Sequence, residues 1–202
     1  MSCLILDTST EQCLVALTRK NQIVAQEIFP HSNRLSNFLI PRIQSLIEEH
    51  CQSLQDLIEI AIGIGPGSYT GTRIGTAVAK CMAFGLQIPL KTFPSPLAFL
   101  PEQEGTFAFV IPTRSNQLYA LMGHISSSAI HQGQTFFLNV DEYNKIEKAD
   151  FLICSSPELL PAKLKNKTYF LPVPNFRPLC LLLSEKEHSP LENIELLYLN
   201  TP

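Results

Sequence analysis

Residues 58–75 read Ile58-Glu-Ile-Ala-Ile-Gly-Ile-Gly-Pro-Gly-Ser-Tyr-Thr-Gly-Thr-Arg-Ile-Gly75, and an Ala-rich run continues to Gly85. Six of the nine glycines of the chain lie between Gly63 and Gly85. The alternating apolar residues predict a strand over 58–64, and the Ala-rich run predicts a helix over 71–86. Glycine in the connection permits positive φ angles and close approach of another group, beside the free N–H groups of a helix start. The loop therefore suits either a bound anion or tight packing.

The flanking sequence predicts an α/β protein. Before the loop we expect strands at 2–7, 13–19 and 22–28, with a Lys20-Asn21 turn between the last two, and a helix over 33–49 capped by Ser32 or Asn33. After it we expect a strand at 89–93 and a short helix at 95–100. The remainder predicts strands at 106–111, 117–125, 133–138, 150–154 and 168–172, and helices at 157–164 and 176–187.

This order describes two successive β-β-β-α-β-α units, of which the second is reduced. The change from one to the other fits best at Pro101-Glu-Gln-Glu-Gly105. We therefore predict a first lobe over 1–102 and a second lobe over 103–202, with the last helix able to pack back on the first lobe.

Composition excludes several functional classes. The chain has 202 residues, of which 45% are hydrophobic and 16% charged, and its net charge is −3. No cluster of Lys or Arg is present, so we expect no direct hold on nucleic acid. No apolar run is long enough for a membrane span, and the N-terminus lacks the basic region of a signal peptide. The six scattered cysteines fit reduced thiols in a cytoplasmic protein.

A candidate phosphate site combines two segments. Asp7, Thr8 and Ser9 follow the first strand, and Gly65, Gly67, Ser68 and Thr70 belong to the glycine-rich loop. A carboxylate and hydroxyls at a strand end can hold a phosphate or its metal, although a plain turn that bonds its own backbone is favoured on the residues alone. The loop lacks the lysine of a P-loop and does not follow G-x-G-x-x-G.

The helix over 71–86 has two apolar faces. Gly75, Ala79 and Ala83 form a flat strip on which another helix can lie close, and Ile74, Val78 and Cys81 form an apolar core face. Such a helix is either deeply buried or part of an interface, and the residues leave both open.

Catalytic groups are not expected. A metal-binding helix would carry a second ligand four residues after His31, where Leu35 stands. The second-lobe counterpart of Asp7-Thr8-Ser9 reads Thr113-Arg114-Ser115 and has no carboxylate. No G-x-S-x-G motif or cysteine nucleophile context occurs. We therefore expect no catalytic residue, no metal and no cofactor.

Three segments together resemble the bacterial TsaB (YeaZ-like) family. They are Asp7-Thr8-Ser9-Thr10, then His31-Ser32 before an amphipathic helix, then the intact order from Gly65 to Gly75. The ending Leu196-Leu197-Tyr198-Leu199 is also similar. The resemblance is close over 1–92 and loose over 106–202.

The resemblance implies an ASKHA-type fold (actin, sugar kinase, Hsp70) with a shortened second lobe. It also implies a non-catalytic subunit that binds the TsaD catalytic paralogue and supports threonylcarbamoyl transfer to the tRNA adenosine next to the anticodon. TsaE, a P-loop ATPase, completes that assembly, tRNA contact is indirect, and the isolated protein pairs with itself. His31 matches the first histidine of the TsaD metal pair, and Leu35 replaces the second. Many relatives carry Asp-Ala-Arg where this chain has Thr113-Arg114-Ser115.

The resemblance also implies that the first two helices form the contact surface, which would explain the apolar excess at Phe38 and Ile40. The implied partner-binding residues are Leu35, Phe38, Leu39, Arg42, Ile74, Gly75, Val78, Ala79, Met82 and Ala83. The alternative is a small phosphotransferase or ATPase of the same fold that uses Asp7 and the glycine-rich loop. A glycoprotease has the least support, because no nucleophile or metal pair is present.

Overall fold

The computed structural model describes residues 1–32, 34–51, 53–113, 117–127, 129–160, 164 and 166–199, with the side chains of 140, 141 and 159 set aside. The chain divides into two compact units. The first comprises Met1–Leu97 together with Leu183–Tyr198, and the second comprises Ala98–Leu182 with the last residues. The first unit is therefore completed by a segment that follows the second unit in the chain.

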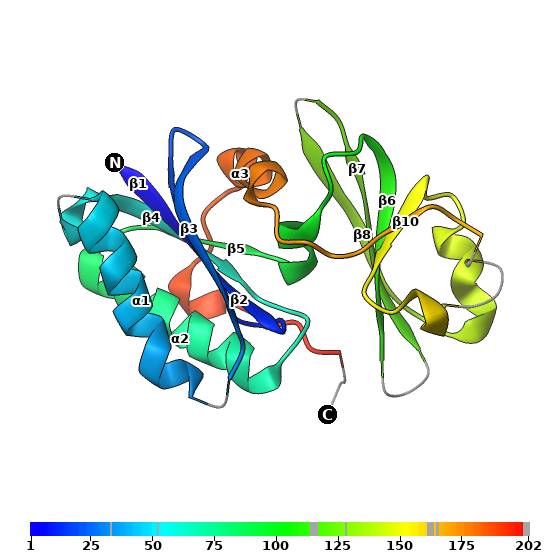
Figure 1. The fold of residues 1–202 in the computed structure, drawn as a ribbon, viewed down its shortest axis with the longest axis horizontal. Helices are drawn as coiled ribbons and strands as arrows, with labels where there is room; N and C mark the ends of the chain where they lie inside the picture. The colour runs from blue at the N-terminus through cyan, green and yellow to red at the C-terminus, as the bar shows by residue number, and fades with distance from the viewer. Residues whose placement is uncertain are drawn as a thin grey trace. The chain divides into compact units, whose positions relative to one another are not determined.

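The first unit is a five-stranded sheet with two long helices on one face (Figure 1). Its elements are β1 Ser2–Asp7, β2 Gln12–Arg19, β3 Gln22–Pro30, α1 Leu35–His50, η1 Leu54–Asp56, β4 Leu57–Gly63, α2 Tyr69–Leu86, β5 Leu90–Phe93 and η5 Leu191–Asn193. The strand order is β3-β2-β1-β4-β5. β1 and β2, and β2 and β3, are antiparallel, whereas β4 is parallel to both β1 and β5.

The second unit repeats the topology of the first. Its strands are β6 Gly105–Pro112, β7 Leu118–Ile125, β8 Ile130–Leu138, β9 Phe151–Cys154 and β10 Tyr169–Phe170. They are ordered β8-β7-β6-β9-β10, with the same sequence of antiparallel and parallel pairs. The expected duplicated α/β arrangement is confirmed. The short elements η3 Val140–Ile146 and η4 Pro157–Leu159 stand where the first unit has its long helices.

Two further elements fall at the passages between the units. η2 Ser95–Phe99 ends the first pass through the first unit, and α3 Phe176–Glu185 precedes the return to it. Within the described ranges, no helix has the length and apolar character needed to cross a bilayer.

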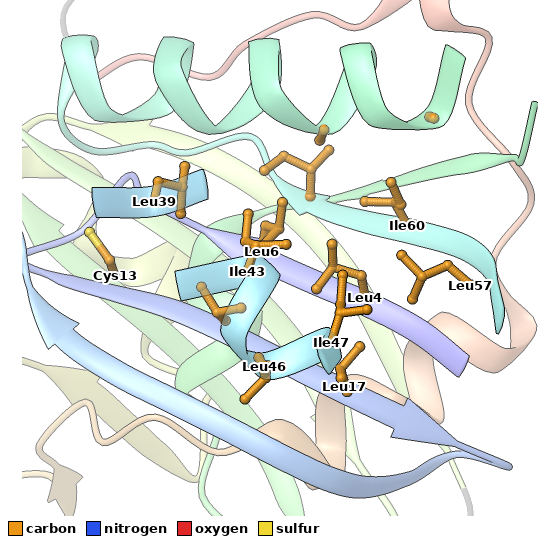
Figure 2. Close-up of a cluster of buried hydrophobic side chains, with 14 of the residues drawn as sticks. Leu4, Leu6, Cys13, Leu17, Leu39, Ile43, Leu46, Ile47, Leu57 and Ile60 are labelled. Atoms are coloured by element: carbon orange, nitrogen blue, oxygen red, sulfur yellow. The ribbon is translucent and has the colours of Figure 1, made fainter. Parts of the chain in front are cut away.

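The core of the first unit explains why these residues form these elements. β1 and β2 present alternate side chains to α1, because successive residues of a strand point to opposite faces. The buried residues of α1 follow helical spacing: Leu35, Leu39, Ile43, Leu46 and Ile47. Figure 2 shows Leu39, Ile43 and Ile47 directed toward Leu4 and Leu6 of β1.

Two local expectations are settled at the ends of these elements. The turn between β2 and β3 is confirmed, since Lys20 and Asn21 have φ angles of 52° and 59°, as a tight hairpin requires. The expected cap of α1 is wrong. Arg34 holds the N-cap position without a side-chain cap, Ser32 Oγ only accepts a hydrogen bond from Arg34 N at 3.4 Å, and Asn33 lies outside the described residues.

Residues 189–198 return to the first unit and are held there by hydrogen bonds and apolar packing. Ser189 N donates to Leu90 O at 2.7 Å, and Leu197 N donates to Ile64 O at 2.8 Å. Between these points, Leu191 and Ile194 pack against the core. This segment thus lies along the β5 edge and reaches the start of the glycine-rich loop.

Candidate functional site

The glycine-rich loop joins β4 to α2 within the first unit. Ser68 caps α2, because its Oγ accepts a hydrogen bond from Gly71 N at 3.1 Å and its carbonyl accepts one from Thr72 N at 2.9 Å. Gly65 has a φ of 91°, in the region that favours glycine. The loop therefore turns the chain out of the sheet and starts the helix, two residues before the predicted position.

The loop and α2 pack directly on the turn formed by Asp7, Thr8 and Ser9. Ser68 N donates to Ser9 O at 2.5 Å, and Thr8 Oγ1 donates to Gly71 O at 2.7 Å. A Cβ on any of four glycines would collide with this turn: Gly63 with the Asp7 carboxyl, Gly67 with the Ser9 carbonyl, Gly71 with the Thr8 carbonyl, and Gly75 with the Thr8 hydroxyl. These glycines therefore serve close packing inside the chain.

The carboxyl of Asp7 is the buried polar centre of this contact. Its Oδ1 accepts hydrogen bonds from Ser9 N at 2.8 Å and Ser9 Oγ at 2.7 Å. Ser95 Oγ lies 2.6 Å from Ser9 Oγ and accepts a hydrogen bond from Gly65 N at 2.9 Å, which ties the turn to the loop. Burial raises the pKa of the Asp7 carboxyl, and the hydrogen bonds from Ser9 and Ser95 oppose this shift. Among the described residues, no group bonds its Oδ2.

The residues expected to form a degenerate nucleotide loop are largely brought together. Asp7, Thr8 and Ser9 are buried against the loop, whereas Thr70 is exposed at the start of α2. Their polar atoms mainly bond one another. Nucleotide binding here stays a prediction, and the geometry favours packing. In the described parts of the chain, no three His, Cys, Asp or Glu side chains are placed to share a metal ion.

The structure places the other two segments considered for a site, around His31 and around Thr113, in the first and the second unit respectively. The His31 ring lies beside Gly71, and its Nε2 bonds to none of the described residues. Leu35 is buried in the core. In the second unit, Thr113 Oγ1 donates to Gln117 O at 3.0 Å, and Arg114 and Ser115 lie outside the described residues.

The structure decides between the two roles that the sequence left open for the small residues of α2. Gly75, Ala79 and Ala83 are buried against the sheet of the first unit. Of the face expected in the core, Ile74 and Val78 are half-buried and pack against the core, whereas Cys81 is exposed. The physical reason is distance, because only small side chains allow α2 to approach Thr8 and Ile62 so closely.

The remaining residues implied as partner-binding divide in the same way. Leu39, like Leu35, is buried in the core and is not available at an outer surface. Phe38 is 48% exposed. Arg42, one turn farther along α1, pairs with Glu27 at 2.6 Å and lies 4.4 Å from the centre of the Phe29 ring. Met82 is half-buried and faces α1.

Sequence reasoning missed most of a groove between α1 and α2. Its lining comes from α1, the segment around η1, and α2: Ile40, Ile43, Gln44, Ile47, Glu48, Cys51, Ser53, Leu54 and Met82. Ile40, whose apolar excess was noticed, is 56% exposed. Phe84 on α2 is 76% exposed and was not singled out. Its position on the helix, opposite the small residues, was the available signal. We refer to Ile40, Leu54, Ile74, Val78, Cys81, Met82 and Phe84 as the α1–α2 outer surface.

Comparison with known proteins gives sequence relatives that match about half of the chain. Residues 23–122 match the family described as TsaD, tRNA N6-adenosine threonylcarbamoyltransferase. The chain is 37% identical over 95 residues to the tRNA threonylcarbamoyladenosine biosynthesis protein TsaB of Bacillus subtilis, and 38% identical over 93 residues to that of Escherichia coli. These alignments cover 47% and 45% of this chain, and 42% and 38% of the relatives. The matched part is therefore less than half of either relative.

Comparison with solved structures covers nearly the whole chain. A Pseudomonas aeruginosa protein described as similar to peptidase YeaZ superposes with a TM-score of 0.80 at 24% identity, over 98% of this chain and 99% of that chain. YeaZ from Pseudomonas aeruginosa superposes with a TM-score of 0.77 at 23% identity, over the same shares. At such identities the likeness shows the fold alone.

The Asp7 carboxyl predicts a pH-dependent stability. A raised folded-state pKa gives stability that is present below about pH 3.9, the ordinary value, and is lost as pH rises through the folded-state pKa. The unfolding free energy of the wild type should therefore fall relative to that of Asp7→Asn as pH rises from 4 to 8, measured by urea denaturation. Asp150→Asn, at an exposed aspartate, is the control. Equal pH slopes in wild type and Asp7→Asn would contradict this interpretation.

The glycine packing predicts opposite effects at two positions of one helix. Gly75→Ala should lower the unfolding free energy by about 1–3 kcal/mol, because its Cβ meets the Thr8 hydroxyl. Gly85→Ala should raise it by about 0.5–1 kcal/mol, because nothing lies near the new methyl group and alanine favours the helix. Thermal and urea unfolding measure both. Similar effects of the two substitutions would show that Gly75 is not needed for close approach.

Proposed function

We propose that the chain belongs to the TsaB (YeaZ-like) family and is a non-catalytic subunit of a tRNA-modifying complex. It binds a TsaD-type catalytic paralogue and supports transfer of threonylcarbamoyl to the tRNA adenosine next to the anticodon. The names of its relatives give the process, since they are tRNA threonylcarbamoyladenosine biosynthesis proteins. The observation that carries the proposal is the α1–α2 outer surface, on which the large apolar side chains of Ile40, Leu54 and Phe84 are 56%, 46% and 76% exposed.

The arrangement around Asp7 supports a non-catalytic role. A phosphoryl-transfer site needs carboxylates that reach a metal and a group that orients the nucleophile. Here Asp7 is buried, bonds Ser9, and has a raised pKa that disfavours the charged form. The four glycines that could open a ligand site are closed on the Asp7–Ser9 turn. The phosphotransferase alternative therefore has less support from the structure than from the motifs alone.

The outer surface supports partner binding. Ile40 and Met82 line one groove, and Ile74, Val78 and Met82 follow one another at four-residue spacing along α2. Large apolar side chains gathered on one surface mark interaction sites. The resemblance implied that the small residues of α2 also contact the partner. Ala79 and Ala83 instead pack in the core of the first unit, so the larger residues of the α1–α2 outer surface make the contact.

The proposal extends to the rest of the assembly. The same surface pairs two copies of the isolated protein, so that the homodimer and the complex with the TsaD-type paralogue exclude one another. A TsaE-type ATPase joins through the complex, and tRNA is held by the other subunits, since the net charge is −3. The protein works in the cytoplasm with the tRNA.

A matched pair of isoleucines tests the surface. Ile40→Glu should weaken binding to the TsaD-type paralogue from the same organism at least about tenfold, because a charge is buried in an apolar contact. Ile28→Glu should leave the affinity unchanged, because Ile28 is similarly exposed (43%) but lies on β3 outside the surface. Calorimetric titration gives both affinities.

Reconstituted tRNA modification is the second measurement. The TsaD-type and TsaE-type proteins should modify tRNA with the wild type or Ile28→Glu and much more slowly with Ile40→Glu. The proposal fails if this chain modifies tRNA without them, or if they work equally well in its absence.

A further inference from the structure

Arg73 is an exposed side chain that the structure holds in one orientation. Its guanidinium carbon lies 3.9 Å from the centre of the Tyr69 ring, one turn earlier on α2. Its Nε donates a hydrogen bond to Tyr198 Oη at 3.3 Å. The Tyr198 ring in turn lies 5.2 Å from that of Tyr69. Stacking on one face and bonding at Nε leave little rotational freedom to a side chain that is normally flexible.

The returning segment 189–198 keeps this cluster in place. Leu197 N donates to Ile64 O immediately before Tyr198, so the tyrosine is fixed at the start of α2. The cluster thus consists of two residues of α2 and one residue far along the chain. Its formation gives the guanidinium a defined plane.

Among the described residues, the hydrogen bond that Arg73 makes runs from Nε and leaves its terminal nitrogens to other partners. The cation–π contact with Tyr69 uses the face of the guanidinium, and the hydrogen bond to Tyr198 uses its Nε. In the described parts of the chain, no carboxylate pairs with Arg73. A planar fork with both terminal groups free matches the two oxygens of a carboxylate. Because the side chain is already ordered, pairing loses less conformational entropy than at a mobile arginine.

The position of Arg73 relates it to the α1–α2 outer surface. Arg73 and Phe84 are 11 residues apart, close to three full helical turns, so both lie along one side of α2 about 16 Å apart. Ile74, the next residue, belongs to the outer surface. A partner element that runs along α2 can therefore contact Phe84 and Arg73 together.

We propose that Arg73 binds a carboxylate of an acidic side chain on the partner protein, at the end of the α1–α2 outer surface. This inference rests on the proposed function and adds a charged contact to the apolar contacts of the α1–α2 outer surface. A protein carboxylate fits better than RNA, because RNA affinity requires several cations and this chain has no basic cluster. Arginine and tyrosine are among the residue types that dominate interface energies.

The test measures affinity for the TsaD-type paralogue with three variants. Arg73→Glu should weaken binding about thirtyfold or more, since it sets like charges against each other. Arg73→Lys should weaken it about tenfold, because an ammonium cannot form the two-pronged pair. Tyr198→Phe, which keeps the ring and frees Nε, should weaken it a few-fold. Hydrogen exchange at the Leu197 amide checks that segment 189–198 stays attached in each variant.

Rescue separates a direct contact from a structural role. Acidic surface residues of the paralogue are replaced one at a time by Lys or Arg. One of these paralogue variants should bind Arg73→Glu with near the wild-type affinity. Absence of any rescue, with the segment still attached, would overturn the proposal. So would an Arg73-dependent affinity for tRNA with paralogue binding unchanged.

The two proposals fail in different ways. If wild type binds the paralogue, Ile40→Glu does not, and Arg73→Glu binds normally, the charged contact is refuted and the partner surface stands. If wild type does not bind the paralogue, the proposed function is itself refuted.

Discussion

The close contact between the glycine-rich loop and the Asp7–Ser9 turn is the constraint on which the first unit depends. It joins the end of β1 to the start of α2, and it exists because four positions have no Cβ. That contact sets the distance of α2 from β1 and β4. The distance in turn decides that small residues face the sheet, whereas a large residue such as Phe84 lies on the exposed side of α2. The outer surface is thus a consequence of an inner contact.

The same contact changes the chemistry of its polar groups. In an open loop, Asp7 and the hydroxyls of Thr8 and Ser9 would be available to a ligand. Here they bond one another and the backbone of α2, and burial disfavours the charged form of Asp7. A motif whose residue types could bind phosphate here packs the end of β1 against the start of α2. Such use fits a protein whose role depends on presenting a surface.

Much of the fold could be predicted from the sequence, because local patterns determine it. Alternation located the strands of the first unit to within two residues, and the spacing of Leu35, Leu39 and Ile43 located α1. The orientation of α2 could not be predicted in this way. Both of its faces are apolar, and choosing between them requires knowing that Gly75 meets Thr8, a contact across 67 positions of sequence. The small size of Gly75 and Ala79 indicates close approach, but does not say to what. The cluster of Arg73 with Tyr198 was equally hidden, because its members lie 125 positions apart.

The return of residues 189–198 to the first unit has a consequence for how the molecule is made. During synthesis, the edge of β5 and the loop near Ile64 emerge long before Ser189 and Leu197, which pair with them. The sheet of the first unit therefore lacks the contacts with residues 189–198 while the second unit is being translated. Contacts of such long sequence separation form late and slow folding. The first unit can thus be completed only after the entire intervening chain has been synthesised. A ribosome-bound fragment that ends before residue 189 lacks the contacts at the start of α2.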